Sequence, residues 1–226
     1  MIICVGFLYL NMNDFKPILS IETSSDLCGA ALLVSPENYF SYEIKKKNIH
    51  SEKLIPMIQS LLESAGIKIN DLSHIAVSIG PGSFTGLRIG LSAAKGLAFG
   101  AGIGICPVPT FEAFALMICR FVPENTNFVI ARKVNIDELY CARFVKHRDI
   151  YKIVNSLEII KKDNFNNYIT PDDLIFGNYN DREKDVPADT DAISVAKWSY
   201  LYGLNLITLD YDFLEPNYIK KFEGRK

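Results

Sequence analysis

The chain has 226 residues, of which 49% are hydrophobic and 22% charged, and its formal net charge is −2. This is the composition of an ordinary globular protein with room for a substantial core in one or two domains. The small net charge argues against strong, independent binding to a nucleic-acid backbone, which needs a basic excess. The five cysteines form no C-x-x-C pair and the three histidines lack metal-ligand spacing. We therefore expect reduced thiols in a cytoplasmic protein and no zinc or disulfide framework.

The first convincing strand follows Met12, so residues 1–16 are predicted to be an N-terminal extension. Their apolar run, 2–10, is too short to cross a bilayer and lacks the basic start and cleavage site of a signal peptide. We expect no membrane contact.

Residues 17 to about 105 are predicted to form three strands, a helix, a strand and a second helix. The helical spacing of 51–65 places Ser51 at its N-cap and Gly66 at its end, with Pro56 as a kink or as the effective start. The run 75–79 is predicted to be a buried strand. The ranges of the other predicted elements are 17–21, 29–34, 39–44 and 91–99.

Pro107 and Pro109 mark a change of unit. Beyond them a helix is predicted over 111–121, and a last helix, capped by Thr190 or Asp191, through Tyr202. Strands are predicted over 127–131, 138–146, 152–161 and 174–177. The domains are thus expected to be a first α/β lobe, 17–108, and a second, 109–226, whose C-terminal helical segment packs back on the first.

A glycine-rich stretch, Gly80-Pro-Gly-Ser-Phe-Thr-Gly-Leu-Arg-Ile-Gly90, joins the predicted strand 75–79 to the next helix. Such a turn can aim backbone N–H groups at an anion, or it can simply be a tight connection. No Lys-Ser/Thr pair follows Gly86, and the glycine spacing does not fit G-x-G-x-x-G. The nucleotide loops of those two kinds are therefore disfavoured.

Small residues form two stripes on the predicted helix that follows this turn. One contains Gly86, Gly90, Ala94 and Ala98, and the neighbouring one contains Ser92, Gly96 and Gly100. Interior glycines weaken a helix, so something is expected to approach it closely. That neighbour is either this protein's own sheet or another chain, and the pattern alone leaves both open.

Charged side chains offer no legible catalytic arrangement. Arg88 lies near the helix N-terminus, where a cation is slightly unfavourable. This favours a carboxylate partner across an interface or a nucleotide phosphate, and the alternative is an exposed arginine in water. Asp137 and Glu138 are adjacent on a predicted strand, so they are expected on opposite faces and not in one acid/base site.

Three segments, 18–24, 50–56 and 80–90 with Ala94-Lys95-Gly96, resemble the TsaB (YeaZ) family in sequence, order and spacing. Arg132 with Glu138-Leu139-Tyr140 resembles the second-domain strand pair of that family. Residues 216–220 resemble its Pro-x-Tyr-x-Arg ending, with Lys220 in place of Arg. The resemblance covers the chain from about Pro17 and is specific in the first half.

The resemblance implies the two-lobed α/β fold of the actin/Hsp70-like ATPase superfamily, which is ribonuclease H-like. It implies a non-catalytic scaffold or activator subunit for forming threonylcarbamoyladenosine at position 37 of tRNA, paired with the catalytic paralogue TsaD. A TsaE-like ATPase is an implied partner, tRNA an indirect one, and a homodimer in isolation is allowed. No cofactor is expected on this chain alone, although ATP or ADP is allowed at the complex junction. The alternative is an autonomous ATPase or metallohydrolase of the same superfamily.

The site residues implied by the resemblance fall into two groups. Residues expected to bind the partner, on the helices 51–65 and 84–99, are His50, Leu54, Ile58, Leu61, Gly86, Arg88, Ile89, Gly90, Ala93, Ala94 and Leu97. Residues allowed to lie near a nucleotide are Glu22, Thr23, Ser24, Gly82 and Ser83.

The chain departs from active relatives at several of these positions. Glu22 replaces the usual Asp, Ser24 stands where a Gly is wanted, and residues 106–111 lack the His-x-x-x-His pair of TsaD-type proteins. No metal ligand or catalytic residue is therefore expected. On the partner interpretation, a Gly90→Leu variant is expected to fold but not to pair.

Overall fold

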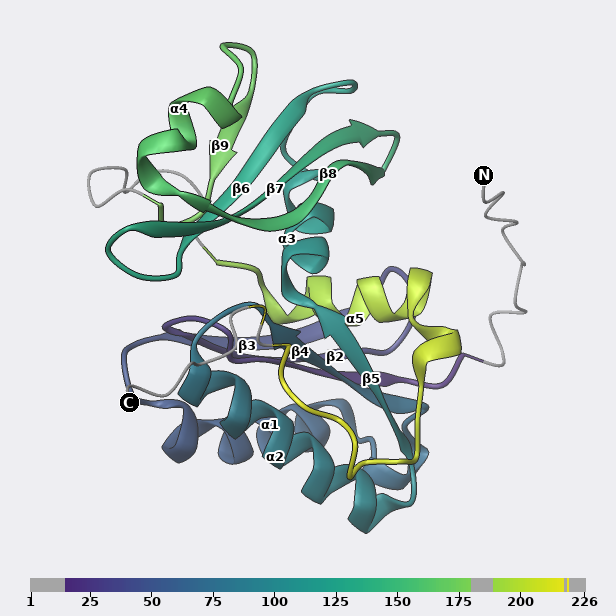
Figure 1. Ribbon diagram of the computed structural model, residues 1–226. Coiled ribbons are helices and arrows are strands. Elements are labelled where there is room, and N and C mark those ends of the chain that lie inside the picture. Colours follow the sequence, from purple (N-terminus) through teal and green to yellow (C-terminus); the bar gives the residue numbers. More distant parts are fainter. Residues whose placement is uncertain (1–14, 180–188, 218, 220–226) are drawn as a thin grey trace, which may run out of the picture.

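The computed structural model describes residues 15–179, 189–217 and 219. Its strands form two sheets, one in each half of the chain, with helices α3 (Thr110–Ile118) and α5 (Ala192–Tyr202) between them (Figure 1). The predicted two-lobed α/β organisation is confirmed.

The first sheet has five strands in the order β3-β2-β1-β4-β5. The central strand β1 is antiparallel to β2 and parallel to β4, and β4 is parallel to β5. This order and these directions are those of the ribonuclease H-like fold. The strands span Ile18–Glu22 (β1), Leu27–Leu33 (β2), Tyr39–Lys45 (β3), His74–Gly80 (β4) and Gly104–Pro109 (β5).

Helices cover both faces of the first sheet. Helices α1 (His50–Ala65) and α2 (Phe84–Ala101) lie side by side under one face, where Leu54, Leu61 and Ala94 join the core. Helix α5 covers the other face, where Trp198 is buried. A sheet buried on both faces requires the nearly continuous apolar strands seen here.

The second sheet repeats the strand order of the first, without a fifth strand. Its order is β8-β7-β6-β9, with β6 antiparallel to β7 and parallel to β9. Its outer face is covered by the single turn α4 (Phe165–Tyr168). The strands span Asn127–Lys133 (β6), Glu138–His147 (β7), Ile150–Lys161 (β8) and Leu174–Phe176 (β9).

Helix α3 joins the two cores. Ala113 and Leu116 pack against the first sheet with α5, whereas Phe111, Phe114 and Ile118 pack against the second. A helix that is apolar all round fits this fully buried position.

Most predicted elements are present, with changes at their ends. Helix α1 begins at His50 and its N-cap residue is Ile49, so the prediction of Ser51 as its cap is wrong. Pro56 lies inside the helix and does not set its start. Ser83 caps α2 and Asp191 caps α5 through their side chains.

The C-terminal segment returns to the first lobe. Thr208 pairs with Ile105 at the open edge of β5, and the Asn217 N–H donates to the Ile79 carbonyl at 2.7 Å. Among the described residues, no helix is both long enough and apolar enough to span a membrane.

Candidate functional site

The glycine turn is packed against the loop after β1. The Ser83 N–H donates to the Ser24 carbonyl at 2.7 Å. A Cβ atom on Gly82 would lie 2.4 Å from that carbonyl oxygen, and one on Gly86 would lie 2.0 Å from the Thr23 carbonyl oxygen. These glycines therefore let two backbone segments meet. Carbonyl oxygens face the turn, which disfavours an anion at this position.

The C-terminal segment packs on the same turn. Gly80 adopts a φ of +109°, and a Cβ there would lie 3.2 Å from the Asn217 carbonyl oxygen. The carboxyl end of β4 is an edge where open α/β sheets commonly bind ligands. Here the chain's own backbone covers it.

The first small-residue stripe of α2 faces the sheet. A Cβ on Gly90 would lie 2.2 Å from Thr23 Oγ1, and Ala94 and Ala98 are fully buried. The packing interpretation is therefore correct for this stripe. The expectation that Gly90→Leu leaves the monomer intact is wrong, because Leu has no room between the helix and β1.

Several residues expected to bind a partner also belong to the core of the lobe. Leu54, Ile58 and Leu61 of α1 are at most 2% exposed and pack under the first sheet. Gly86 is buried against Thr23. These side chains support the helices from inside, so they offer no surface to a second chain.

The second stripe of α2 faces outward. Ser92, Gly96 and Gly100 are exposed, and nothing lies within 4 Å of a Cβ built on either glycine. Beside the stripe, Ile89, Ala93 and Leu97 are half-buried. We call Ser92, Gly96 and Gly100, with these three neighbours, the outer face of α2. Its glycines have no role in packing against the part of the chain that the structure describes.

His50 and Arg88 lie at the starts of the two helices. His50 is buried as the first residue of α1, and its Nε2 lies 3.2 Å from the Leu27 carbonyl. Arg88 is exposed and its guanidinium lies 3.9 Å from the centre of the Phe84 ring. This contact holds Arg88 at the edge of the outer face of α2.

Glu22 closes the end of β1 as a buried carboxylate. It accepts hydrogen bonds from the Ser24 N–H, at 2.6 Å, and from the Ser78 hydroxyl. Burial raises its pKa, although the two serines and the charge of Arg132 act in the opposite direction. Each of its two carboxylate oxygens accepts a hydrogen bond from within the chain, so Glu22 is a structural group at this strand end.

Arg132 connects the two lobes. From β6 it donates to Ser24 Oγ and to Asp189, both at 3.2 Å, and it is 5% exposed. Asp189 also pairs with Lys45 at 3.0 Å. Burial acts to raise the pKa of Asp189, but Arg132 and Lys45 outweigh it and hold that pKa below its usual range. The resemblance singled out Arg132 but not its partners. Ser24 and Asp189 are 108 and 57 residues away in the sequence, so no local motif connects them with Arg132.

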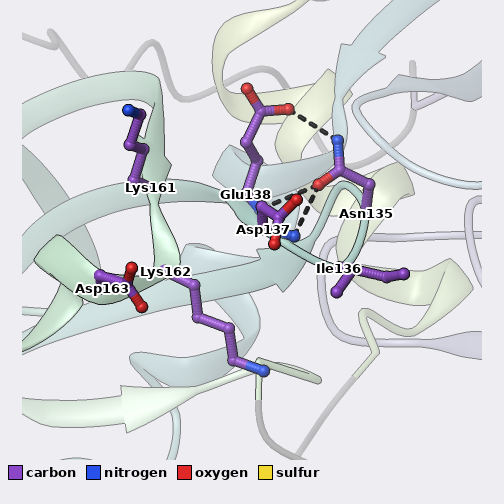
Figure 2. A pocket seen from close by; sticks show the side chains of 7 residues that line it. All are labelled: Asn135, Ile136, Asp137, Glu138, Lys161, Lys162 and Asp163. Carbon is purple, nitrogen blue, oxygen red and sulfur yellow. Dashed lines mark hydrogen bonds between the residues drawn. The ribbon is translucent and has the colours of Figure 1, made fainter.

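The structure brings Asp137 and Glu138 into one hollow of about 470 Å³, which corrects the expectation that they cannot share a site (Figure 2). The reason is that Asp137 lies in the turn before β7, where Asn135 Oδ1 accepts the N–H groups of both residues at 2.9 Å. Lys161, Lys162 and Asp163 also line it, so its charge is mixed. Across the described residues, no group of three His, Cys, Asp or Glu side chains has the arrangement of a metal site.

These features define a two-lobed α/β protein whose glycine turn is filled by its own backbone. Among solved structures, "YeaZ from Pseudomonas aeruginosa" has the same fold, with a TM-score of 0.72 and 24% identity over 91% of this chain and 100% of that one. The family profile described as "tRNA N6-adenosine threonylcarbamoyltransferase" (TsaD) matches residues 43–139.

Curated relatives are similar to part of this chain. The TsaB protein of Haemophilus influenzae is 32% identical over 131 residues, which are 58% of this chain and 55% of that protein. The TsaB protein of Escherichia coli is 36% identical over 129 residues, or 56% of this chain and 54% of that protein. The match thus spans about half the length of these relatives. Over this part of its length, the chain is similar to proteins of the TsaB (YeaZ) family.

Proposed function

We propose that this chain is a non-catalytic subunit in the formation of threonylcarbamoyladenosine at position 37 of tRNA, and that it docks a TsaD-like paralogue. The relatives at 32% and 36% identity are called tRNA threonylcarbamoyladenosine biosynthesis proteins, which supports the pathway. The self-filled glycine turn supports a role other than phosphate chemistry.

The observation that carries the docking proposal is the outer face of α2. Gly96 lies in the interior of an 18-residue helix, on its exposed side, with open space around its Cβ position. A helix-interior glycine costs about 0.5–1 kcal/mol relative to alanine. No contact within the described chain offsets this cost. Close approach by a second helix does, since small residues let two backbones come together.

The family profile indicates what such a partner presents. The TsaD profile matches residues 43–139, which include both α1 and α2. A TsaD-like chain therefore carries a related helix pair. Two related helix pairs can meet about a local two-fold axis, as in isologous interfaces. The proposal therefore assigns the contact to exposed residues of α1 and α2, with Ile55 of α1, 46% exposed, facing the partner.

The test is titration calorimetry of the purified chain into a purified TsaD-like paralogue from the same organism. Gly96→Leu fills the open stripe and is expected to weaken pairing by at least tenfold while the monomer stays folded. Ser156→Leu adds the same side chain to exposed β8 of the second lobe, so it controls for surface hydrophobicity. Wild-type affinity in Gly96→Leu would rule out this interface. A wild-type chain that does not pair would rule out the proposed function.

A further inference from the structure

Strand β3, the edge strand of the first sheet, carries an unusual surface. Tyr39, Phe40 and Tyr42 are 46%, 38% and 40% exposed, although a strand edge usually displays polar side chains. Lys45, Lys46 and Lys47 follow at once, and all three are exposed. We call Phe40, Tyr42, Lys46 and Lys47 the β3 surface.

Phe40 and Tyr42 lie on the same side of the strand. Side chains alternate along a strand, and Tyr42 reaches α1, where its hydroxyl lies 3.3 Å from Ser64 Oγ. Tyr39 lies on the opposite side, where Lys197 Nζ is 5.6 Å from its ring centre. Two positions on one side of a strand are about 7 Å apart. Phe40 and Tyr42 therefore form a pair of neighbouring rings, each partly covered and partly open.

Tyr42 is held in place before any ligand arrives. Its contact with Ser64 fixes the ring against the last turn of α1, so little side-chain freedom remains to be lost on binding. An exposed ring with one side supported by protein and one side open can stack a base, and such stacking tolerates any base.

The charges next to these rings suit a phosphate backbone. Lys46 and Lys47 extend from the turn that follows the strand, beyond the two rings. Two carboxylates of this region have partners within the chain, and Glu52 also interacts electrostatically with Lys46. Glu43 accepts the Ala192 N–H on the opposite side of the sheet, and Glu52 pairs with Lys53 at 2.6 Å. Glu37 is exposed before the strand, so the basic end of the surface is the one at the turn.

The second lobe offers an internal comparison. Strand β8 has the same topological place in its sheet as β3. Its exposed large side chains are the aliphatic Ile153 and Val154, and its Tyr151 is turned inward to bond Glu112 and Trp198. The combination of aromatic rings and lysines is thus particular to β3, because the equivalent edge strand β8 does not have it.

We infer that the β3 surface binds unpaired nucleotides of RNA, with bases on Phe40 and Tyr42 and phosphates on Lys46 and Lys47. Aromatic side chains with adjacent basic groups are the usual means of binding single-stranded RNA. Only the identification of this RNA as a tRNA loop rests on the proposed function. Because the net charge is −2, the contact is local and adds to binding by an assembly.

The experiment is fluorescence anisotropy of the full chain with two labelled probes, a 17-nucleotide tRNA anticodon stem-loop and an unstructured 12-nucleotide RNA, across a salt series. Phe40→Ser with Tyr42→Ser is expected to weaken binding of both probes by about fivefold or more, the low end of base-stacking effects. Lys46→Gln with Lys47→Gln is expected to lower the slope of log affinity against log salt by about 1.4 for the unstructured RNA. The matched control is Ile153→Ser with Val154→Ser on β8.

Several results would overturn the inference. One is that the wild-type chain binds neither probe at 50 mM salt. Another is that the β3 variants bind both probes as tightly as the β8 control variant does. Loss of paralogue pairing in the β3 variants with unchanged RNA binding would assign the surface to protein instead. If the aromatic variant fails to fold, the lysine variant decides the matter. Pairing of the wild-type chain with its paralogue, measured separately, distinguishes failure of this inference from failure of the proposed function.

Discussion

The two lobes share one strand order but differ in what covers their sheets. In the first lobe the 16-residue α1 and the 18-residue α2 form a complete helical layer on one face. In the second lobe, within residues 127–179, the corresponding face carries only the four-residue α4. The two lobes therefore have the same strand arrangement, and they differ in the helices that cover it. A surface that can contact another helical protein needs such a helical layer. The docking surface that we propose lies on the first lobe.

The contact between the lobes shows a second difference. Glu22 ends β1 and Arg132 lies near the end of β6, which are the first strands of the two sheets. The corresponding strand ends therefore carry a carboxylate in the first lobe and a guanidinium in the second. Arg132 then binds Ser24 and Asp189, so the junction is held by the protein's own side chains.

The largest expected effect separates the two stripes of α2. Gly90→Leu forces a side chain into the space of Thr23 Oγ1, 2.2 Å from the Cβ position, and pushes α2 off β1. We expect a loss of about 3 kcal/mol, the upper part of the range for overpacked cores. Urea unfolding followed by the fluorescence of Trp198, the single tryptophan, measures it. A stability equal to wild type would show that α2 can move away from the sheet without cost.

Arg132→Met tests the junction of the lobes. It removes one of the two cations that pair with Asp189, and we expect a loss of about 2 kcal/mol, below the usual cost of breaking a fully buried ion pair. Arg143→Met is the matched control, because Arg143 pairs with Asp173 inside the second lobe at 2.8 Å. Hydrogen exchange should rise in the loop at 23–25 only for Arg132→Met. Equal exchange in both variants would argue against a specific link between the lobes.

The first lobe also predicts a dependence of stability on pH. His74 of β4 is buried, and this burial lowers its pKa to about 4, while its Nε2 lies 2.6 Å from Ser199 Oγ of α5. The unfolded chain therefore binds a proton near pH 6.5 that the folded chain binds only near pH 4. Stability is complete above pH 6.5 and should fall by about 2 kcal/mol on acidification from pH 7 to 5. His74→Gln should flatten this part of the curve, and an unchanged slope would assign it to another group.

The smallest expected effect on stability is that of Gly96→Leu. The open space around this position accepts a side chain, and replacing an interior glycine improves helix propensity by up to about 1 kcal/mol. We expect a free energy of unfolding equal to or slightly above wild type. Marked destabilisation would mean that the outer face of α2 is packed within the chain.

Local patterns in the sequence predict much of the first lobe. The strand β4, the glycine turn and the helix α2 follow from a buried run, glycine spacing and a Ser83 cap. The start of α1 was missed because Ile49 caps it without a side-chain hydrogen bond, so the cap leaves no sequence signal.

The candidate site was harder to predict. Helical periodicity revealed both small-residue stripes, but it could not tell which one the sheet covers, because that depends on the rotation of α2 about its axis. The long-range contacts were also out of reach. Ser24 and Arg132 are 108 residues apart, and no local pattern joins them. The β3 surface could be recognised only from the exposed fractions of its side chains, since strands rich in aromatic residues are usually buried.

The most direct test of the account is reconstitution of threonylcarbamoyl transfer to tRNA with the TsaD-like paralogue and the other components, with and without this chain. The account predicts that modification requires the chain, is lost with Gly96→Leu, and is retained with Ser156→Leu. Modification at the full rate without this chain, or with Gly96→Leu in its place, would contradict it.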